Sequence, residues 1–241
     1  MINIEILYPE VANLYGDLFN AYLLQRSYPD LIQITETHLN SEPSFPREDV
    51  DFIFMGACPE RYQEMSIDLL RPHLPALRDF IQMGKPALFT GNSLEIFGSY
   101  IENDDGTQIP ALGLHDGYAV RRMMNRYNSM YLGEFSETGL EIVGFKSQFS
   151  KTYGLADNQH LFHTLREMDA ENSSMDEGLR LNNLMGTYLT GPFLIMNPLF
   201  AKHILGLLGI QNPTLAHEEV LVYAYSKRLE EAQNPATNFA V

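Results

Sequence analysis

The chain has one cysteine and no long apolar run. Cys58 stands alone among 241 residues, which excludes an internal disulfide framework and a metal site built from several thiolates. No run of eighteen apolar residues occurs, so no membrane-spanning helix is expected. The first residues, MINIEILYPEVANLYGD, carry acidic side chains where a signal peptide would carry basic ones. We therefore expect a cytoplasmic protein that does not bind membranes.

Positive charge is also scarce. Lysine and arginine together number 16 against 31 acidic residues, which gives a formal net charge of -15. Such a charge repels phosphate backbones and anionic lipid surfaces, so binding to nucleic acid would need a local basic patch. The stretch RRMMNR at 121–126 is the one candidate, and it is short. We expect an acidic surface and no nucleic-acid partner.

Common cofactor and metal motifs are missing. The sequence contains no P-loop, no GxGxxG and no GxSxG serine elbow. His160 and His163 have a spacing found in metal sites, but acidic or thiolate ligands at matching spacing are absent. We expect neither a metal nor a cofactor.

What is present is an alternation of strand and helix patterns. Apolar runs predict strands at 2–7, 31–36, 51–55 and 87–90, separated by helical patterns, and this order indicates parallel βαβ units. The clearest helix covers 61–83, where apolar residues recur at spacings of three and four. Residues 157–180 read as a long loop and 234–241 as a frayed tail. Further strands are expected at 117–121, 129–135, 140–145 and 182–189, and helices at 198–208 and 215–231. We expect one α/β domain over residues 1–241.

Two loops at strand ends are candidate sites, because ligands collect at the carboxyl ends of parallel strands. In ALFTGNSLEIFG at 87–98 a strand turns directly into a helix, the geometry of a nucleophile elbow, but the corner residue is Gly91. An ordinary turn capped by Asn92 or Ser93 is the alternative. The loop at 54–64 carries Cys58, a thiol that is more often inert than reactive. We also expect that Gly186→Val disrupts a turn at a crowded strand end and lowers soluble yield.

Four segments carry a family resemblance. They are YPEVANLYGDLFNAYLLQR (8–26), GLHDGY (113–118), EIVGFKSQFSKTY (141–153) and GTYLTGPFLIMNP (186–198). Together they resemble the CobB/CobQ-like class I glutamine amidotransferases, which implies a flavodoxin-like sheet with flanking helices and extra antiparallel strands. Within that family the chain is similar to the glutaminase subunits of lipid II isoglutaminyl synthases. That similarity implies a Mur-ligase-like partner subunit and amidation of peptidoglycan precursors.

The resemblance also implies that the catalytic residues are lost. Aligned on Gly98, the family's nucleophilic cysteine falls on Gly91, and the histidine of Gly-Thr-Tyr-Leu-His-Gly-Pro falls on Thr190. A threonine hydroxyl does not accept and return a proton near neutral pH. The acidic residue that orients the histidine resembles Asp17, which without that histidine can simply cap a helix. No catalytic residue is therefore expected.

The pocket around these positions is altered too. The family's oxyanion loop resembles Gly-Gly-Gly-Gln-Asp, whereas this chain has GACPE at 56–60, including a proline without an N–H. Lys146, Ser147, Gln148 and Ser150 replace residues near the glutamine pocket. If a ligand such as glutamine still binds, the expected contacts are Gly56, Cys58, Asn92, Glu95 and Gln148.

Three hypotheses follow. The first is a catalytically degenerate amidotransferase-like subunit that acts by binding a Mur-ligase-like partner. The second is a sensor that binds glutamine or another amino acid without cleaving it. The third is an enzyme of altered chemistry in the same cleft, using Cys58, Glu60, Glu95 or Asp17, whose carboxylates would need raised pKa values.

Overall fold

A six-stranded sheet forms the centre of the protein. The computed structural model describes residues 1–168 and 176–240. The strand order is β13-β14-β4-β3-β1-β2, and all neighbouring pairs are parallel except β13 with β14. The predicted parallel sheet is confirmed. The strands are β1 (Ile2–Leu7), β2 (Ile32–Thr37), β3 (Phe52–Met55), β4 (Ala87–Thr90), β13 (Leu179–Leu181) and β14 (Leu184–Thr187).

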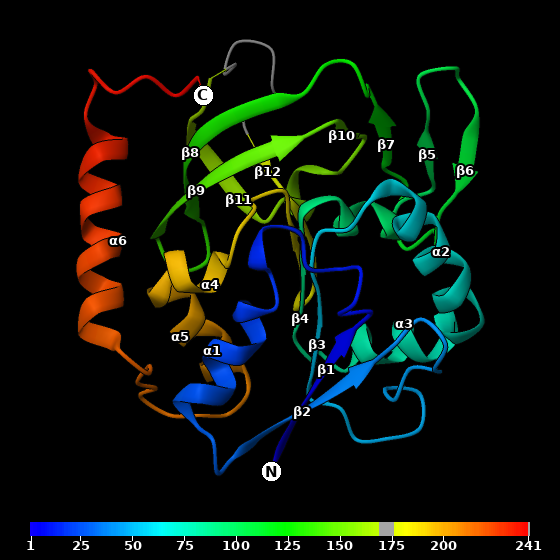
Figure 1. The fold of residues 1–241 in the computed structure, drawn as a ribbon, viewed down its shortest axis with the longest axis horizontal. Helices are drawn as coiled ribbons and strands as arrows, with labels where there is room; N and C mark the ends of the chain where they lie inside the picture. The colour runs from blue at the N-terminus through cyan, green and yellow to red at the C-terminus, as the bar shows by residue number, and fades with distance from the viewer. Residues whose placement is uncertain (169–175, 241) are drawn as a thin grey trace.

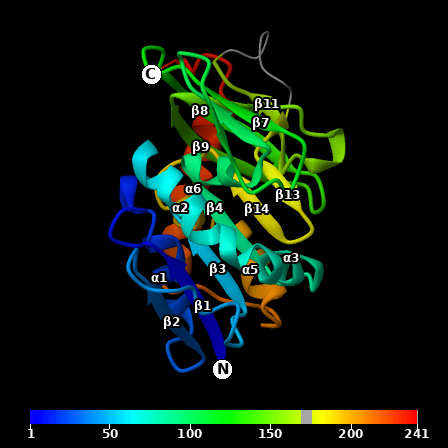
Figure 2. The ribbon, with the colours of Figure 1, turned by 90° about the vertical axis from the view of Figure 1, so that its right-hand side faces the viewer.

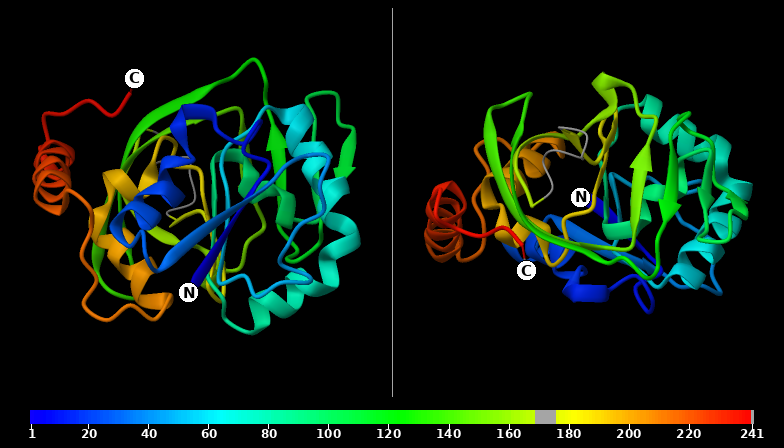
Figure 3. Two further views of the ribbon diagram at one scale, coloured as in Figure 1. Left: turned by 60° about the horizontal axis from the view of Figure 1, so that its bottom comes forward. Right: turned by 90° about the horizontal axis from the view of Figure 1, so that it is seen from above.

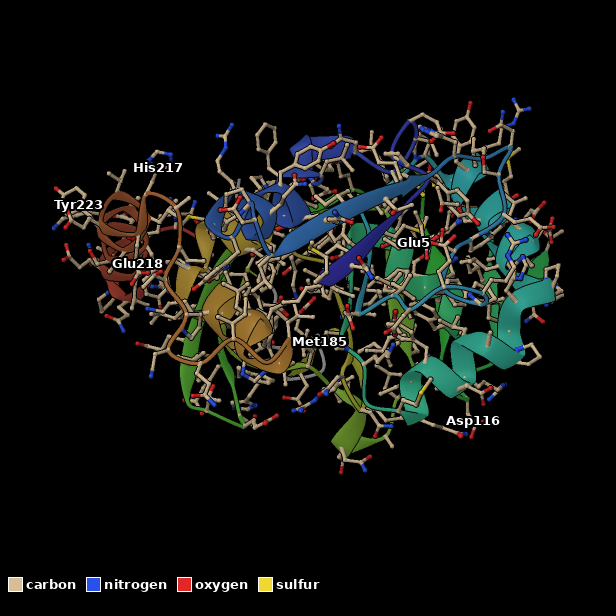
Figure 4. The ribbon with its side chains drawn as sticks, turned by 90° about the horizontal axis from the view of Figure 1, so that it is seen from below. Glu5, Asp116, Met185, His217, Glu218 and Tyr223 are labelled. Carbon is tan, nitrogen blue, oxygen red and sulfur yellow. The ribbon has the colours of Figure 1, made fainter. Side chains whose placement is uncertain are left out.

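Helices cover both faces of this sheet, and Figure 1 shows them as two groups on opposite sides of β1, β3 and β4. Each group buries its own apolar cluster against the strands, as expected for strands covered on both faces. In the view from below, Glu5 and Met185 lie between the two groups (Figure 4). One group contains α1 (Phe19–Ser27), α4 (Phe193–Met196) and α5 (Pro198–Leu207), and the other α2 (Glu60–Leu70) and α3 (Leu74–Gln82).

The single helix predicted for 61–83 is wrong. A 3₁₀ turn, η2 (Arg71–His73), separates α2 from α3. Pro72 and Pro75 fall at this junction, and a proline inside a helix removes a backbone donor and clashes with the preceding turn. The apolar stripe continues across the break because both helices pack on the same cluster. The other 3₁₀ helices are η1 (Leu14–Gly16), η3 (Gly91–Phe97) and η4 (Asp157–Gln159).

Two smaller sheets lie at the end of the molecule opposite the N-terminus, as Figure 2 shows. The first has the order β10-β7-β5-β6 and the second β12-β11-β8-β9, and the hairpin expected between the middle strands is the long β8–β9 pair. Helix α6 (Glu218–Gln233) packs against the outside of β8 and β9 (Figure 3). The strands are β5 (Tyr100–Glu102), β6 (Gln108–Pro110), β7 (Tyr118–Arg121), β8 (Tyr127–Phe135), β9 (Leu140–Gln148), β10 (Ser150–Tyr153), β11 (Phe162–Arg166) and β12 (Asp176–Glu177).

Two loop predictions are wrong. The segment 157–180 contains β11, which pairs with β8 and buries Phe162 among the aromatic rings of the core; its residues 169–175 lie outside the described residues. The C-terminal tail is held, since Ala240 bridges Ser129 and Phe239 is 4% exposed. Among the described residues, none of the helices has the length and apolarity to span a bilayer.

Gly186 lies inside β14, not in a turn. A Cβ built at this position would lie 2.6 Å from the Cβ of the buried Leu94. We expect Gly186→Val to destabilise the fold by about 2 kcal/mol through this overpacking. Chemical denaturation and soluble yield measure the loss, with Gly206→Val as the control, because no atom lies within 4 Å of a Cβ there. Equal stability of the two variants would contradict the packing of β14 against η3.

Candidate functional site

The carboxyl ends of β3, β4 and β14 meet at one edge of the central sheet. The loops that follow them close around a cavity of about 180 Å³. Eight of the residues selected from the sequence lie around it: Cys58, Glu60, Gly91, Asn92, Ser147, Gln148, Ser150 and Thr190. Gly56, Asp17 and Glu95 do not line it, although they lie in the surrounding layer. Parallel strand direction therefore brings together most of the predicted site.

Gly91 occupies the elbow, and its backbone has the expected geometry. Its φ of +62° is in the left-handed region that favours glycine. A Cβ at this position would lie 2.4 Å from the Cβ of Ala57, closer than side chains approach. Ala57 therefore fills the space in which a nucleophilic side chain would begin.

Two amides of the loop at 56–60 already have hydrogen-bond partners. The Ala57 N–H donates to Asp17 Oδ2 at 2.9 Å, and the Cys58 N–H donates to Asn92 Oδ1 at 3.1 Å. Asn92 also donates from Nδ2 to the Cys58 carbonyl at 2.8 Å, so one side chain binds both backbone polar groups of Cys58. Pro59 has no N–H. None of these three positions offers a free donor to a negatively charged oxygen in the cavity.

Thr190 lies 5% exposed on the other side of the cavity. Its hydroxyl donates to the Phe145 carbonyl at 3.0 Å, and its amide donates to the same oxygen at 2.9 Å. The threonine thus fixes the backbone of β9 to the end of β14. A hydroxyl whose proton is bound to a carbonyl is poorly placed to act as a base.

Asp17 is fully buried below the cavity floor. Its carboxylate holds the Ala57 amide, and burial raises its pKa to about 7 while that hydrogen bond lowers it. The alternative of a helix cap is wrong, because α1 starts after Leu18 without a side-chain cap. Asp17 instead positions the loop that follows β3.

Glu95 is the centre of a buried polar network. Its carboxylate accepts hydrogen bonds from Gln63, from Ser150 and from the Tyr188 hydroxyl. Burial raises the pKa of Glu95, and these three donors, together with the nearby Arg121, act in the opposite direction. With its oxygens engaged, Glu95 joins η3 to β10 and to the segment that follows β14, instead of facing a ligand.

Sequence patterns do not identify the rest of this network. Arg121 belongs to the basic run at 121–126, yet it is 4% exposed and pairs with Glu64 at 2.6 Å. Gln63 of α2 is buried and accepts from Arg121 at 2.6 Å. Ser93 is buried and donates back to the Thr90 carbonyl. Lys146 lies away from this cavity and pairs with Glu167. Within residues 1–168 and 176–240, no cluster of three or more His, Cys, Asp or Glu suits a metal ion.

Cys58 is buried at 1% exposure, and burial followed by the nearby Glu60 carboxylate raises its pKa to about 12. Thiolate chemistry at neutral pH requires the opposite shift. We expect no alkylation of the native protein by iodoacetamide at about pH 8, and full alkylation after unfolding in guanidinium. Mass spectrometry measures both, and rapid native labelling would contradict the buried position of the thiol.

Comparisons with known proteins identify the family. Residues 3–198 match the model of the CobB/CobQ-like glutamine amidotransferase domain. The chain is 30% identical over 190 residues to the lipid II isoglutaminyl synthase subunit GatD of Staphylococcus aureus, covering 77% of this chain and 75% of that one. The GatD subunit of Streptococcus pneumoniae is 24% identical over 200 residues, covering 81% and 76%.

Solved structures support the fold. A glutamine amidotransferase crystal structure superposes with a TM-score of 0.55 at 12% identity, covering 86% of this chain and 99% of that one. A glutamine amidotransferase from Thermotoga maritima gives a TM-score of 0.52 at 11% identity, covering 95% and 91%. The predicted class I amidotransferase-like fold is confirmed. The chain belongs to the CobB/CobQ-like glutamine amidotransferase family.

Proposed function

We propose that this protein is a non-hydrolysing amidotransferase subunit that acts by binding a Mur-ligase-like partner in the amidation of cell-wall precursors. The relatives' name, a subunit of lipid II isoglutaminyl synthase, supports the assembly and the pathway. The proposal treats residues 1–241 as one cytoplasmic domain. The observation that carries the loss of hydrolysis is the engagement of the loop amides by Asp17 and Asn92.

Glutamine hydrolysis by this family's chemistry needs three things at one place. A nucleophile attacks the amide carbon, a base takes and returns its proton, and backbone donors stabilise the oxyanion. Here the elbow carries Gly91, the base position carries Thr190, the amides of Ala57 and Cys58 are hydrogen-bonded, and Pro59 has no N–H to donate. Removing one oxyanion donor from an enzyme costs on the order of 10²–10³ in rate. Together these changes argue against ammonia release.

The other two hypotheses fare differently. The raised pKa and burial of Cys58 argue against its use in altered chemistry, and the engaged oxygens of Glu95 argue against a role as acid or base. The sensor hypothesis stays open because a cavity of about 180 Å³ remains beside Asn92 and Gln148. Calorimetry with glutamine and glutamate tests it, and the absence of heat at millimolar ligand would exclude it.

The decisive experiment is ammonia release from glutamine by the tagged protein recovered from a native lysate with its bound chains. We expect no release by the purified protein alone and a Mur-ligase-like chain in the eluate, identified by mass spectrometry. The Cys58→Ala variant is the control: release that persists in it comes from another chain. Release by the purified protein at enzymatic rates would overturn the proposal.

A further inference from the structure

The sheet β10-β7-β5 presents one open face. The pairing register places Tyr153 opposite Tyr118, and Tyr118 beside Tyr100, so three tyrosines form a row across the strands. Because side chains alternate along a strand, the next row on the same face holds Lys151, Val120 and Glu102. The intervening residues Ile101, Ala119 and Arg121 face inward and are buried. Figure 1 places these strands at the edge farthest from α1, α4, α5 and α6.

This face lines a second cavity of about 570 Å³. Both rows contribute to it, and Arg122 follows them at the end of β7. Lys146 and Gln148 of β9 form the opposite wall. The volume lies within the range of sites that bind small molecules. This cavity is larger than the cavity of about 180 Å³ beside Gly91 and Thr190, which we call the remnant cavity. The two cavities share residues 148–150.

The central tyrosine of the row, Tyr118, has no ring face free to stack on a ligand. The Tyr118 ring stacks on Tyr100 with centroids 4.9 Å apart and on Tyr153 with centroids 5.8 Å apart, so both of its faces are covered. What Tyr118 can present to a ligand is its edge, which carries partial positive charge, and its hydroxyl. A row built in this way suits anionic oxygens better than a flat base.

Three cations surround the same space. Lys146 is paired with Glu167 at 2.8 Å, and Arg122 is 4.0 Å from Glu102. Lys151 has no ion-pair partner within residues 1–168 and 176–240. Lys151 therefore carries a positive charge without a carboxylate partner among the described residues, and Arg122 lies at the distance limit of its pair, in a protein whose formal charge is -15. The overall negative charge of the protein repels anions. An anionic ligand would therefore be attracted by the local positive charge in this cavity.

We infer that this cavity binds a small ligand through a phosphate or carboxylate group. Lys151 and Arg122 hold the anionic oxygens, since charge-assisted hydrogen bonds to such groups are the strong ones. The tyrosine hydroxyls and the Gln148 amide contact the polar body of the ligand. This cavity adjoins the smaller one and shares residues 148–150 with it, but of the two Lys151 and Arg122 line only the larger cavity, and the inference does not depend on the loss of hydrolysis.

Calorimetry at constant ionic strength tests the inference with four probes: inorganic pyrophosphate, glucose 6-phosphate, citrate and glutamate. We expect at least one of them to bind at submillimolar concentration, and which of them binds decides between a phosphate and a carboxylate. Lys151→Gln and Arg122→Gln are expected to weaken that binding at least about tenfold each. Both side chains lie at the surface, so the variants are expected to fold, which circular dichroism checks.

Two control variants make the result specific. Arg126→Gln removes a cation that lines the remnant cavity and stacks on Phe149, but does not line the second cavity. Lys227→Gln removes a cation of α6 that lines neither. Both are expected to keep the wild-type affinity. Absence of binding by all four probes at millimolar concentration, or binding lost in Arg126→Gln and kept in Lys151→Gln, would overturn the inference.

Discussion

The double variant Gly91→Cys/Thr190→His is expected to release no ammonia from glutamine, although it introduces a cysteine and a histidine at the two positions where the family resemblance implies them. The new Cβ at position 91 would lie 2.4 Å from the Cβ of Ala57, on a backbone with φ of +62°. A non-glycine residue in the left-handed region and overpacking each cost on the order of 1–3 kcal/mol. We therefore expect the double variant to lose about 2–4 kcal/mol of folding stability as well.

A coupled ammonia assay and chemical denaturation measure these two effects. Adding Ala57→Gly removes the clashing methyl group, so the triple variant is expected to recover part of the lost stability. It is still expected to be inactive, because Asp17 and Asn92 continue to hold the loop amides. Enzymatic ammonia release by the double variant, at wild-type stability, would show that position 57 leaves room for a nucleophile and that the loop can supply donors.

The contrast between Gly91 and Ala57 illustrates what sequence could and could not predict. Gly91 follows an apolar strand and precedes a helix, so its place at an elbow was readable from periodicity and parallel topology. The role of Ala57 was not, because the contact joins loops that are 34 residues apart. The same holds for Glu95 and its partners Gln63, Ser150 and Tyr188, whose burial depends on how three sheets meet.

Errors in the predicted elements have the same origin. Strand β11 has a weak local pattern and exists because β8 provides hydrogen bonds and the aromatic core accepts Phe162. The C-terminal tail looked frayed, yet Phe239 finds a cluster formed by β8, β9 and α6. The break between α2 and α3 has a different origin. Pro72 and Pro75 indicate it in the sequence, but the apolar periodicity continues across it and favours a single helix. In β11 and in the C-terminal tail, long-range contacts override the local propensity of the sequence.

The buried carboxyl of Asp17 makes folding stability depend on pH. Burial raises its pKa from 3.8 to about 7, so between these values the folded state binds more protons than the unfolded state. Stability contributed by this residue therefore falls as pH rises through that window, by up to about 4 kcal/mol. Asp17→Asn keeps an oxygen that can accept from the Ala57 amide at 2.9 Å, but removes the charge. The stability of the variant relative to wild type is expected to rise by about 2–3 kcal/mol from about pH 5 to about pH 8.

Guanidinium denaturation of the two proteins at both pH values measures this difference. Asp68→Asn, an exposed change on α2, is the matched control and is expected to shift stability by less than about 0.5 kcal/mol at either pH. The sign of the result separates two roles for Asp17. If the ionised carboxylate is what holds the loop, the variant will be least stable, relative to wild type, at the higher pH. If a neutral acceptor suffices, as the buried geometry indicates, the Asp17→Asn variant will be most stable, relative to wild type, at the higher pH. In that case Asp17 keeps the Ala57 amide out of the cavity and does not orient a base.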